Sequence, residues 1–375
     1  MAPETLKALA RTAVRGLERG AAEALVWSAG RLRPRASWPP AEPRSILVLR
    51  NNDIGDLLVV TPLFEALRRR FPTASITAAV GRWNVGVLRG NPHISEVLAV
   101  DAPWFNKFVP RQGALRALGF IASSPAGGDL ARRRFDVGID VLGSAWGSLL
   151  MLRAGIPYRL GVRGYAGGHS AVQAWVEFDP WQHVGRGALR FAELLGAADL
   201  PPCRPQLFLS AAERAAGEEA WDGGEYRIAV GPGAGLTVKS WPAERWEELT
   251  GRLAKLPGVR IAVAGGPGER RIGEQLAALS PGVRNLAGHL SLRETFALAA
   301  AADLVICNSS MLMHAAAAFG KPTVVLLGES FPSARQHDAQ WGYPGTCWSL
   351  GKEPGERSTL YTAEEALVRV EELIA

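Results

Sequence analysis

Short apolar runs alternate with segments of helical periodicity along most of this chain, in two series separated by prolines. In the first series the apolar runs lie at 45–50, 75–80, 96–100, 135–141 and 159–162, and the helical segments at 60–71, 83–89, 113–122, 144–154 and 186–196. This alternation is typical of parallel strands joined by crossover helices. We therefore expect a doubly wound, Rossmann-like α/β domain over residues 44–204.

The second series begins after the proline-rich segment 199–205, DLPPCRP. Strands are expected at 226–231, 259–264, 303–307 and 322–327, and helices at 242–255, 268–279, 291–301 and 310–319. A second Rossmann-like domain, residues 205–375, would face the first across a cleft between the carboxyl edges of the two sheets, where ligands favour binding. A terminal helix at 363–374 could close the second domain or cross back to the first.

Composition excludes several classes of protein. The 42 basic and 36 acidic residues leave a net charge of +6, which permits an anionic substrate or membrane surface. No nucleic-acid-binding motif accompanies this charge, so we expect no nucleic-acid partner. Cys203, Cys307 and Cys347 have no disulfide or zinc spacing, and no secretory signal or apolar run of about 18 residues occurs. We expect a cytoplasmic protein.

Residues 1–43 differ from the rest as a basic amphipathic extension. Over residues 4–33 apolar positions recur at helical spacing, while Lys7, Arg11, Arg15 and Arg19 repeat every fourth residue. Such a helix can lie on an anionic inner-membrane surface or pack on the body of the protein, and both possibilities stay open. Residues 33–43, with four prolines, indicate a linker.

The segment RNNDIGDLLVVTP, residues 50–62, follows the first apolar run. It predicts a strand that brings Asp53 and Asp56 to a strand-to-helix turn. We expect Gly55 to turn the backbone sharply with positive φ. Each acid is compatible with a helix N-cap, which accepts unpaired amide protons, or with a functional carboxylate.

The segment GPGAG, residues 231–235, ends a predicted strand, and Lys239 and Pro242 follow before the next helix. Glycines permit close backbone approach, amides at a helix start point toward an anion, and a lysine adds a full charge. These features are typical of a diphosphate-binding site, although glycine-rich turns also commonly connect strands and helices in α/β folds. The segment is neither a Walker loop nor the dinucleotide fingerprint GxGxxG.

Two further turns of this half carry polar residues. Glu269 ends GGPGE, residues 265–269, where it could accept from ribose hydroxyls or complement a helix dipole. Ser309 and Ser310 are suited to capping a helix and to binding phosphate, and His314 to a structural hydrogen bond more than to catalysis. No nucleophile elbow, HExxH motif or metal-spaced carboxylate cluster occurs, so we assign no metal ligands and leave metal dependence open.

Five blocks together resemble glycosyltransferase family 9, the lipopolysaccharide heptosyltransferases, whose members have the two-domain GT-B fold. The blocks are IGD-(x)4-TP at 54–62, FDVGIDVLG at 135–143, GPGAG to KSWP and Trp at 231–246, GGPGE at 265–269, and ADLVICNSSMLMHAAAAFGKPTVVLLG at 302–328. The resemblance runs from about Ser45 to the C-terminus.

The resemblance implies that Asp56 is the catalytic base, that Lys239 contacts the donor diphosphate and that Glu269 contacts the ribose. The implied donor site comprises Gly233, Gly235, Thr237, Lys239, Glu269, Ser309, Ser310 and His314, and the implied acceptor site comprises Arg50, Asn52 and Asp53. Arg82 and Arg163 would lie near the cleft, where they suit an acidic acceptor or serve surface solubility.

The implied reaction is inverting transfer of a sugar, with heptose from ADP-heptose favoured, to a lipopolysaccharide core or related cell-envelope glycan. No tightly bound cofactor is implied beyond the nucleotide-sugar donor, and the acceptor is lipid-linked or a glycan. Where the family usually has Asp, then Ser or Thr, then Gly, this chain has Ser309, Ser310 and Met311. An enzyme using another nucleotide sugar, an epimerase and a non-catalytic sugar-binding member therefore remain alternatives.

Overall fold

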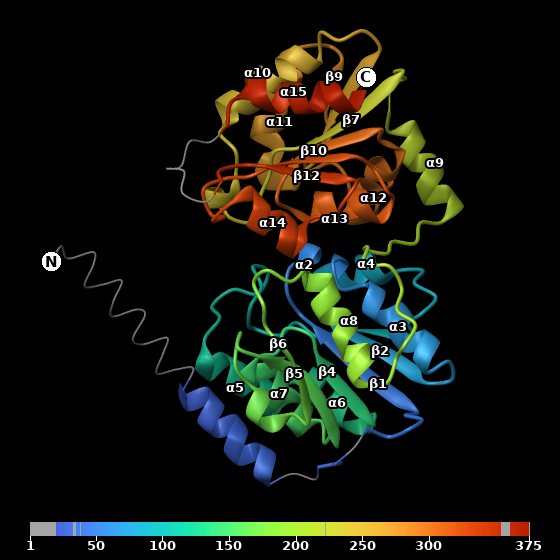
Figure 1. Cartoon of the computed structure of the whole chain (residues 1–375), viewed down its shortest axis with the longest axis vertical. Helices are drawn as coiled ribbons and strands as arrows, with labels where there is room; N and C mark the ends of the chain where they lie inside the picture. Colours follow the sequence, from blue (N-terminus) through green and yellow to red (C-terminus); the bar gives the residue numbers. More distant parts are fainter. Residues whose placement is uncertain (1–19, 33–34, 38, 222, 354–360, 375) are drawn as a thin grey trace, which may run out of the picture.

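Two six-stranded parallel sheets, each covered by helices, form two lobes stacked along the long axis of the molecule (Figure 1). The computed structural model describes residues 20–374 apart from 33–34, 38, 222 and 354–360. Both sheets have the first strand of their series near the centre, with orders β3-β2-β1-β4-β5-β6 and β12-β11-β10-β7-β8-β9. The expected α/β class with two Rossmann-like sheets is confirmed.

The N-terminal sheet contains strands β1 (Ser45–Arg50), β2 (Ser75–Val80), β3 (Glu96–Ala99), β4 (Val137–Asp140), β5 (Tyr158–Arg163) and β6 (Ala174–Glu177). Its helices are α2 (Ile54–Leu58), α3 (Pro62–Arg70), α4 (Val85–Leu88), α5 (Ala114–Ser123), α6 (Pro125–Arg132), α7 (Ala145–Arg153) and α8 (Val184–Leu194).

The C-terminal sheet contains strands β7 (Tyr226–Gly231), β8 (Val259–Val263), β9 (Val283–Asn285), β10 (Leu304–Asn308), β11 (Thr323–Leu326) and β12 (Cys347–Leu350). Its helices are α9 (Ala211–Glu219), α10 (Ala243–Leu253), α11 (Arg270–Ala277), α12 (Leu292–Ala301), α13 (Met311–Ala318), α14 (Ala334–Trp341) and α15 (Ala363–Ile374).

The apolar runs are strands because both faces of each sheet are buried. In β1, Ile46 and Val48 belong to the core under α3 and α8, whereas Leu47 and Leu49 belong to the opposite core under α5 and α7. Successive side chains of a strand point to opposite faces, so a central parallel strand needs apolar residues at every position. The same division holds for β7, where Ile228 and Val230 face one core.

Every expected strand is present, but β6, β9 and β12 were not expected. All three are edge strands, with a partner on one side only, and are short. Helix α2 was not expected, since the predicted helix there was 60–71. Helices α6, α9 and α14 were also missed, because their sequences PAGGDLAR, AAERAAGEE and ARQHDAQW carry few large apolar residues. The terminal helix α15 packs on α10 and β11, so it closes the C-terminal lobe.

The N-terminal helix is described over residues 20–31, and the expected part before residue 20 lies outside the described residues. Ala22 and Val26 are buried in the core below the N-terminal sheet, and the Glu23 carboxylate accepts from the Gly168 and Ser170 amides. The described part of this helix therefore packs on the body of the protein. Among the described residues, no helix has the length and apolarity needed to cross a bilayer.

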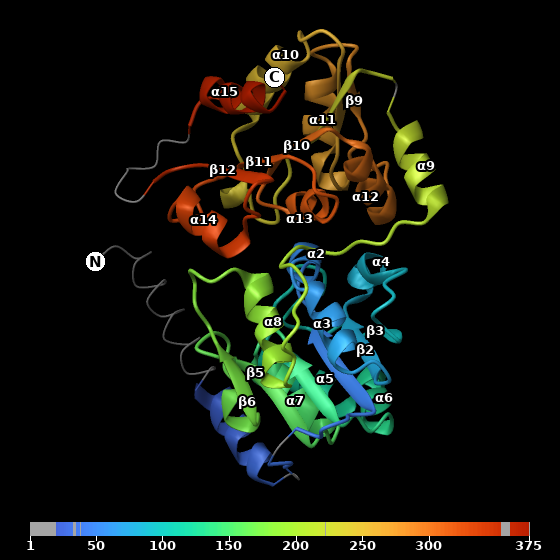
Figure 2. The ribbon, with the colours of Figure 1, turned by 45° about the vertical axis from the view of Figure 1, so that its right-hand side comes forward.

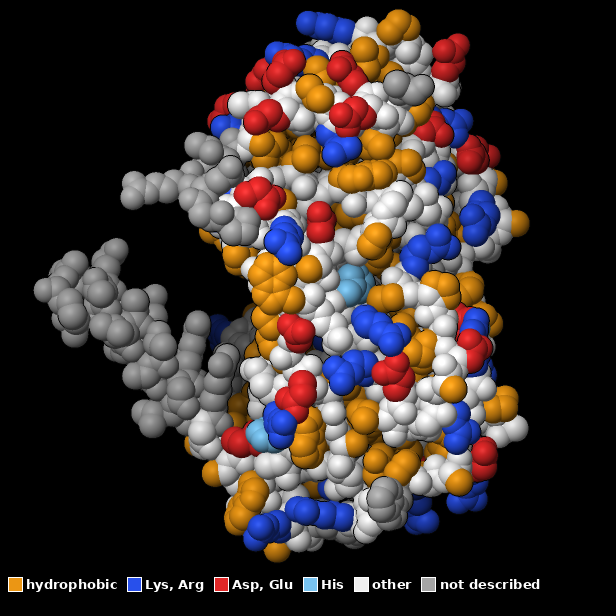
Figure 3. Space-filling model, viewed as in Figure 1, with side chains coloured by type: hydrophobic (Ala, Val, Ile, Leu, Met, Phe, Trp, Pro, Cys, Tyr) orange, Lys and Arg blue, Asp and Glu red, His pale blue; other side chains and the backbone are white. Residues whose placement is uncertain are grey.

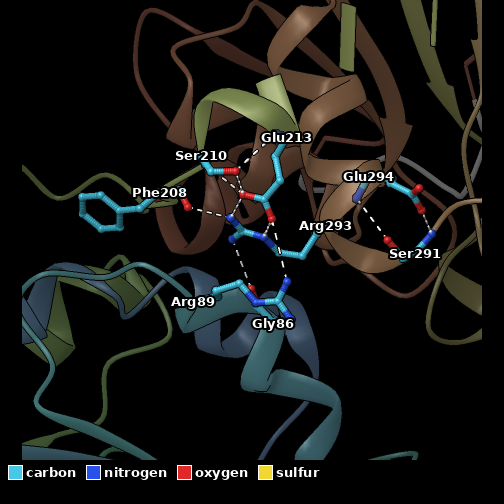
Figure 4. Close-up of polar contacts among 8 residues, drawn as sticks. All are labelled: Gly86, Arg89, Phe208, Ser210, Glu213, Ser291, Arg293 and Glu294. Carbon is cyan, nitrogen blue, oxygen red and sulfur yellow. Dashed lines mark hydrogen bonds and ion pairs between the residues drawn. The ribbon is translucent and has the colours of Figure 1, made fainter. Parts of the chain in front are cut away.

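Helices α2 and α13 meet where the two lobes join, as both ribbon views show (Figure 2). Beside them, Arg293 on α12 donates to Gly86 O on α4 at 3.2 Å, to Phe208 O at 2.6 Å and to both carboxylate oxygens of Glu213 on α9 (Figure 4). This guanidinium therefore contacts the N-terminal lobe, the connecting segment and the C-terminal lobe together.

Candidate active site

Two cavities open at the junction, where the space-filling surface narrows between the lobes (Figure 3). The first, here the aromatic cavity, has a volume of about 370 Å³ and is lined by Phe105, Tyr165, Phe178, Phe191 and Trp341, among others. The second, here the glycine-loop cavity, has a volume of about 440 Å³ and is lined by the turns at 231–235 and 265–269 and by the start of α13.

Asp56, Lys239 and Trp341 line both cavities. Asp56 belongs to α2 after β1, and Lys239 belongs to the 3₁₀ turn Thr237–Lys239 after β7. A carboxylate from one lobe and an ammonium from the other therefore face the same space. The arrangement could bind two ligands side by side, with the two charged groups at their boundary.

Arg50 orients Asp56 from the end of β1. Its Nε donates to Asp56 O at 3.1 Å, and its Nη2 lies 3.5 Å from Asp56 Oδ1. The Arg50 side chain is 5% exposed and that of Asp56 is 31% exposed. The buried guanidinium therefore holds the carboxylate from the protein interior, while the carboxylate still reaches the cavities. Arg50 also faces the buried Asp140, whose pKa burial raises above its ordinary value.

Asp53 occupies the N-cap position of α2, but its side chain makes no capping hydrogen bond. Instead Asp53 Oδ1 accepts from the Lys107 amide at 3.1 Å, which joins the turn after β1 to the loop after β3. Burial raises the pKa of Asp53, while the Lys107 hydrogen bond opposes that shift. Asp53 therefore has the N-cap position without the capping hydrogen bond, whereas the N-cap interpretation of Asp56 is wrong, because Asp56 lies inside the first turn of the helix.

Gly55 does not have the positive φ that we expected, since it lies within helix α2. Its small size matters for another reason. A Cβ on Gly55 would lie 3.1 Å from His314 Cδ2 and 3.4 Å from Met311 Cα, both on α13. A side chain here would therefore require α2 or α13 to shift slightly at the junction of the lobes.

Asn52 closes the same turn and lines the aromatic cavity. Its Nδ2 donates to Phe105 O at 2.9 Å, while its backbone oxygen accepts from Trp83 Nε1 and Asn84 Nδ2, each at 2.9 Å. Its Oδ1 is buried and has no partner within the described residues. Asn52 thus connects three segments around the mouth of this cavity.

The glycine turns form one wall of the glycine-loop cavity because Glu269 packs against them. Glu269 Oε2 accepts from the Gly266 amide at 2.7 Å, so the carboxylate does cap this turn. A Cβ on Gly233 would lie 2.6 Å from Glu269 Cδ, and one on Gly265 would lie 2.7 Å from its Cβ. Larger residues at these positions would displace the carboxylate.

Lys239 is brought to the cavities by a close backbone approach. A Cβ on Gly328, after β11, would lie 2.6 Å from the Lys239 carbonyl carbon, so glycine is needed there. The Lys239 ammonium lies 5.3 Å from the centre of the Phe331 ring, a cation–π distance. Thr237, in the same turn, is exposed and is not among the residues that line either cavity.

Ser309, Ser310 and His314 all line the glycine-loop cavity at the start of α13. Ser310 caps the helix by accepting from the Leu312 amide, and Ser309 Oγ lies 2.9 Å from His337 Nε2. His314 Nδ1 lies 2.5 Å from the Tyr343 hydroxyl, and burial lowers its pKa to about 3. His314 is therefore neutral at physiological pH and has the structural hydrogen bond favoured from the sequence.

The two surface arginines named from the sequence are paired with acids. Arg82 forms an ion pair with Asp101, and Arg163 donates to Glu177 at 3.0 Å. Neither arginine is among the residues that line the cavities. Within the described residues, no group of three or more His, Cys, Asp and Glu side chains is placed to hold a metal ion.

Several lining residues were missed from the sequence. Lys107 and Phe108 reach the glycine-loop cavity from the loop after β3, while Tyr165, Phe178 and Trp341 line the aromatic cavity. The one available signal was the density of aromatic residues in 165–181, YAGGHSAVQAWVEFDPW, a segment without helical periodicity. The loop at 101–113, DAPWFNKFVPRQG, carries a similar density of aromatic residues, with Trp104, Phe105 and Phe108.

Two parallel α/β lobes with cavities at their junction define the GT-B class of glycosyltransferase. The family model described as glycosyltransferase family 9 (heptosyltransferase) matches residues 127–347. Lipopolysaccharide heptosyltransferase 2 of Salmonella typhimurium is 30% identical over 302 residues, covering 76% of this chain and 83% of that protein. Its Escherichia coli counterpart is 29% identical over 303 residues, with the same coverage of both chains.

Solved structures agree with these relatives. The E. coli ADP-heptose lipopolysaccharide heptosyltransferase II superposes with a TM-score of 0.70 at 25% identity, covering 88% of this chain and 98% of that one. A family 9 glycosyltransferase from Veillonella parvula has the same fold, with a TM-score of 0.72 at 20% identity and coverage of 88% and 97%. This chain belongs to glycosyltransferase family 9.

Proposed function

We propose that this glycosyltransferase transfers heptose from ADP-heptose to a sugar of the lipopolysaccharide core, with inversion at the anomeric carbon. The observation that carries the proposal is the placement of Asp56 and Lys239, which come from opposite lobes and line both cavities. Residues 44–204 would form the acceptor-binding domain, and residues 205–375 the nucleotide-sugar-binding domain. The curated relatives named above support the choice of heptose and of a core acceptor.

In this mechanism Asp56 accepts the proton of an acceptor hydroxyl as that oxygen attacks the anomeric carbon. The bond to the nucleoside diphosphate breaks in the same step, and its electron pair leaves with the diphosphate. General-base assistance of this kind contributes about 10²- to 10⁴-fold. Arg50 keeps the carboxylate directed at the cavities, because its guanidinium contacts both the backbone and the side chain of Asp56.

The leaving diphosphate gains charge, which the C-terminal lobe would stabilise. Lys239 supplies a full positive charge, and the amides of Gly233, Gly235 and Ser310 supply dipoles at the glycine turn and the start of α13. Glu269 uses Oε2 for the Gly266 amide, which leaves Oε1 for a ribose hydroxyl. Met311 adds a side chain where the family usually has glycine, so the phosphate would approach the Ser310 side of this turn.

The aromatic cavity suits the acceptor sugar. Tyr165 and Phe178 are each partly exposed and lie with ring centres 4.8 Å apart, which presents an apolar face to a saccharide ring. Asp56, Asn52 and Gln182 line the same cavity and supply polar groups. A few polar groups among apolar walls are typical of small-ligand sites.

The reaction can be tested with the purified full chain, ADP-heptose and a heptose-deficient lipopolysaccharide core. We expect a heptosylated product by mass spectrometry, and neither UDP- nor GDP-sugars should replace the donor. Asp56→Ala should abolish product formation while ADP still binds. Turnover unchanged in this variant would remove Asp56 from the mechanism, and transfer from UDP- or GDP-sugars alone would identify a different donor.

We further propose that helix 20–31 places the enzyme against the anionic cytoplasmic face of the inner membrane, where a lipid-linked acceptor lies. Leu25, Trp27 and Leu32 are exposed, and the Arg31 guanidinium lies 4.0 Å from the centre of the Trp27 ring. Deletion of this helix would also remove Ala22 and Val26 from the core, so substitution of its exposed residues is a cleaner test. Trp27→Ser with Leu32→Ser should reduce sedimentation with anionic vesicles, and equal sedimentation would reject this role.

A further inference from the structure

The glycine-loop cavity receives a second lysine from the N-terminal lobe. Lys107 lies in the loop after β3, and it lines this cavity together with Phe108. Its Nζ lies 3.7 Å from the position that a Cβ on Gly235 would occupy, so its ammonium lies beside the glycine turn of the opposite lobe. We propose that Lys107 is a second diphosphate-binding residue, an inference that rests on the proposed nucleotide-sugar donor.

Charge supports this role. A nucleoside diphosphate brings at least two negative charges, whereas Lys239 is the only lysine or arginine of the C-terminal lobe among the described residues that line the glycine-loop cavity. Asp53, Asp56 and Glu269 line the same cavity and would repel an anion. A second cation is needed to offset these carboxylates, and Lys107 is the one that the lining provides.

Several contacts hold the Lys107 loop in place. The Lys107 amide donates to Asp53 Oδ1 at 3.1 Å, and Asn52 Nδ2 donates to Phe105 O at 2.9 Å. The Phe108 ring stacks on Trp83 with centres 4.7 Å apart. Because the backbone on both sides is fixed, the lysine is directed toward the cavity at a small cost in conformational entropy.

The Lys107 ammonium is available to an anion. Among the ion pairs of the described residues it has no carboxylate partner within 4.0 Å, although it lies in the field of Asp53 and 5.5 Å from the centre of the Phe108 ring. The side chain is exposed. A diphosphate held by Lys239 on one lobe and Lys107 on the other would draw the lobes together, so donor binding and closure of the junction would be coupled.

The test compares Lys107→Gln with Lys255→Gln, which removes the same charge from an exposed position that lines neither cavity. The probes are ADP and adenosine, with binding measured by titration calorimetry. A lost charge-assisted hydrogen bond predicts ADP binding about 10- to 100-fold weaker in Lys107→Gln. Adenosine binding should be unchanged, Lys107→Arg should restore much of the ADP affinity, and Lys255→Gln should match the wild type.

Two results would overturn the inference about Lys107 and leave the proposed function intact. One is equal ADP affinity in the wild type and Lys107→Gln. The other is equal weakening of ADP and adenosine, which would make the residue a support for the loop. Failure of the wild-type protein to bind ADP or to transfer heptose would overturn the proposed function as well, so the two failures are distinguishable.

Discussion

Arg293 and Glu213 form a two-pronged ion pair that joins helices α12 and α9, with Nε–Oε1 at 2.7 Å and Nη2–Oε2 at 2.6 Å (Figure 4). The Arg293 side chain is 8% exposed. The same carboxylate belongs to the capping box that begins α9, where Ser210 and Glu213 satisfy each other's amides. The Arg293–Glu213 pair therefore links the start of α9 to α12, and Arg293 also binds the connecting segment at Phe208 and the N-terminal lobe at Gly86.

Arg293→Met should destabilise the protein by about 1.5–3 kcal/mol, because it removes the charge-assisted hydrogen bonds to Glu213 and leaves the carbonyl oxygens of Gly86 and Phe208 without this donor. Chemical unfolding with urea measures the loss. Arg252→Met is the matched control, since its pairs with Glu248 and Glu364 are exposed and should contribute less than about 1 kcal/mol. Equal losses in the two variants would show that burial gives the Arg293 pair no advantage.

Three buried histidines should make the fold sensitive to mild acid. Burial lowers the pKa of His183 to about 4, and those of His314 and His337 to about 3. The unfolded chain takes up protons at these groups as pH falls below about 6.5, whereas the folded chain does not. Stability is therefore present above this pH and is lost as pH falls, by about 1.4 kcal/mol per histidine between pH 7.5 and 5.5.

The free energy of unfolding, measured at pH 7.5 and 5.5, tests whether the buried histidines cause this loss of stability. His337→Gln can still hydrogen-bond Ser309 and Ser349, whose hydroxyls lie 2.9 and 2.7 Å from the ring nitrogens. This variant should lose less stability on acidification than the wild type. His289→Gln, at an exposed position, should behave like the wild type. An undiminished acid sensitivity in His337→Gln would assign the effect to other groups.

Asp56→Asn should lower kcat by about 10²- to 10⁴-fold, because the amide cannot accept the acceptor's proton. The dissociation constant for ADP should not rise, since the amide keeps the size of the carboxylate and removes a negative charge from the glycine-loop cavity. Asp129→Asn, an exposed acid on α6, is the matched control for charge. Weaker ADP binding in Asp56→Asn together with an unchanged kcat would assign Asp56 to donor binding.

Gly55→Ala tests the contact between α2 and α13. The new Cβ would lie 3.1 Å from His314 Cδ2, and His314 cannot move freely because it is buried and hydrogen-bonded to Tyr343. The helix that carries Asp56 should shift slightly to relieve this contact, and catalysis is sensitive to small displacements of the reacting groups. We expect a reduced kcat with the fold retained.

Gly119→Ala is the control for the effect of glycine itself. A Cβ on Gly119, in helix α5, meets nothing within 4 Å. Alanine there should raise stability by about 0.5–1 kcal/mol, without an effect on rate. A Gly55→Ala enzyme with wild-type kcat would show that the lobes tolerate a wider junction.

The sequence predicted the central strands, because continuous apolar runs leave few alternatives, and it also predicted the edge strand β3 from the run EVLAV. It did not predict the edge strands β6, β9 and β12, which are only three or four residues long. For the site, the turns after β1, β7 and β10 were visible, and the structure brings Asp56, Lys239 and Ser310 to one cavity. Their chemical roles stay predictions.

The roles of residues that depend on contacts between segments far apart in the sequence could not be predicted from the sequence. Gly55 has the helical backbone of α2, and only the approach of α13 explains its size. Lys107 reaches the cavity because Asp53, 54 residues earlier, binds its amide. Sequence patterns report local periodicity, whereas such contacts follow from how the loops of two sheets meet.

The strand orders bear on how this chain is synthesised. All six strands of the first sheet lie before residue 178, and all six of the second lie after residue 225. No strand is exchanged between the sheets, so the leading sheet can complete its hydrogen bonding while the ribosome is still making the trailing one. During that interval the surface of α2 around Gly55 has no α13 to cover it, so it stays open to solvent until the second sheet is made.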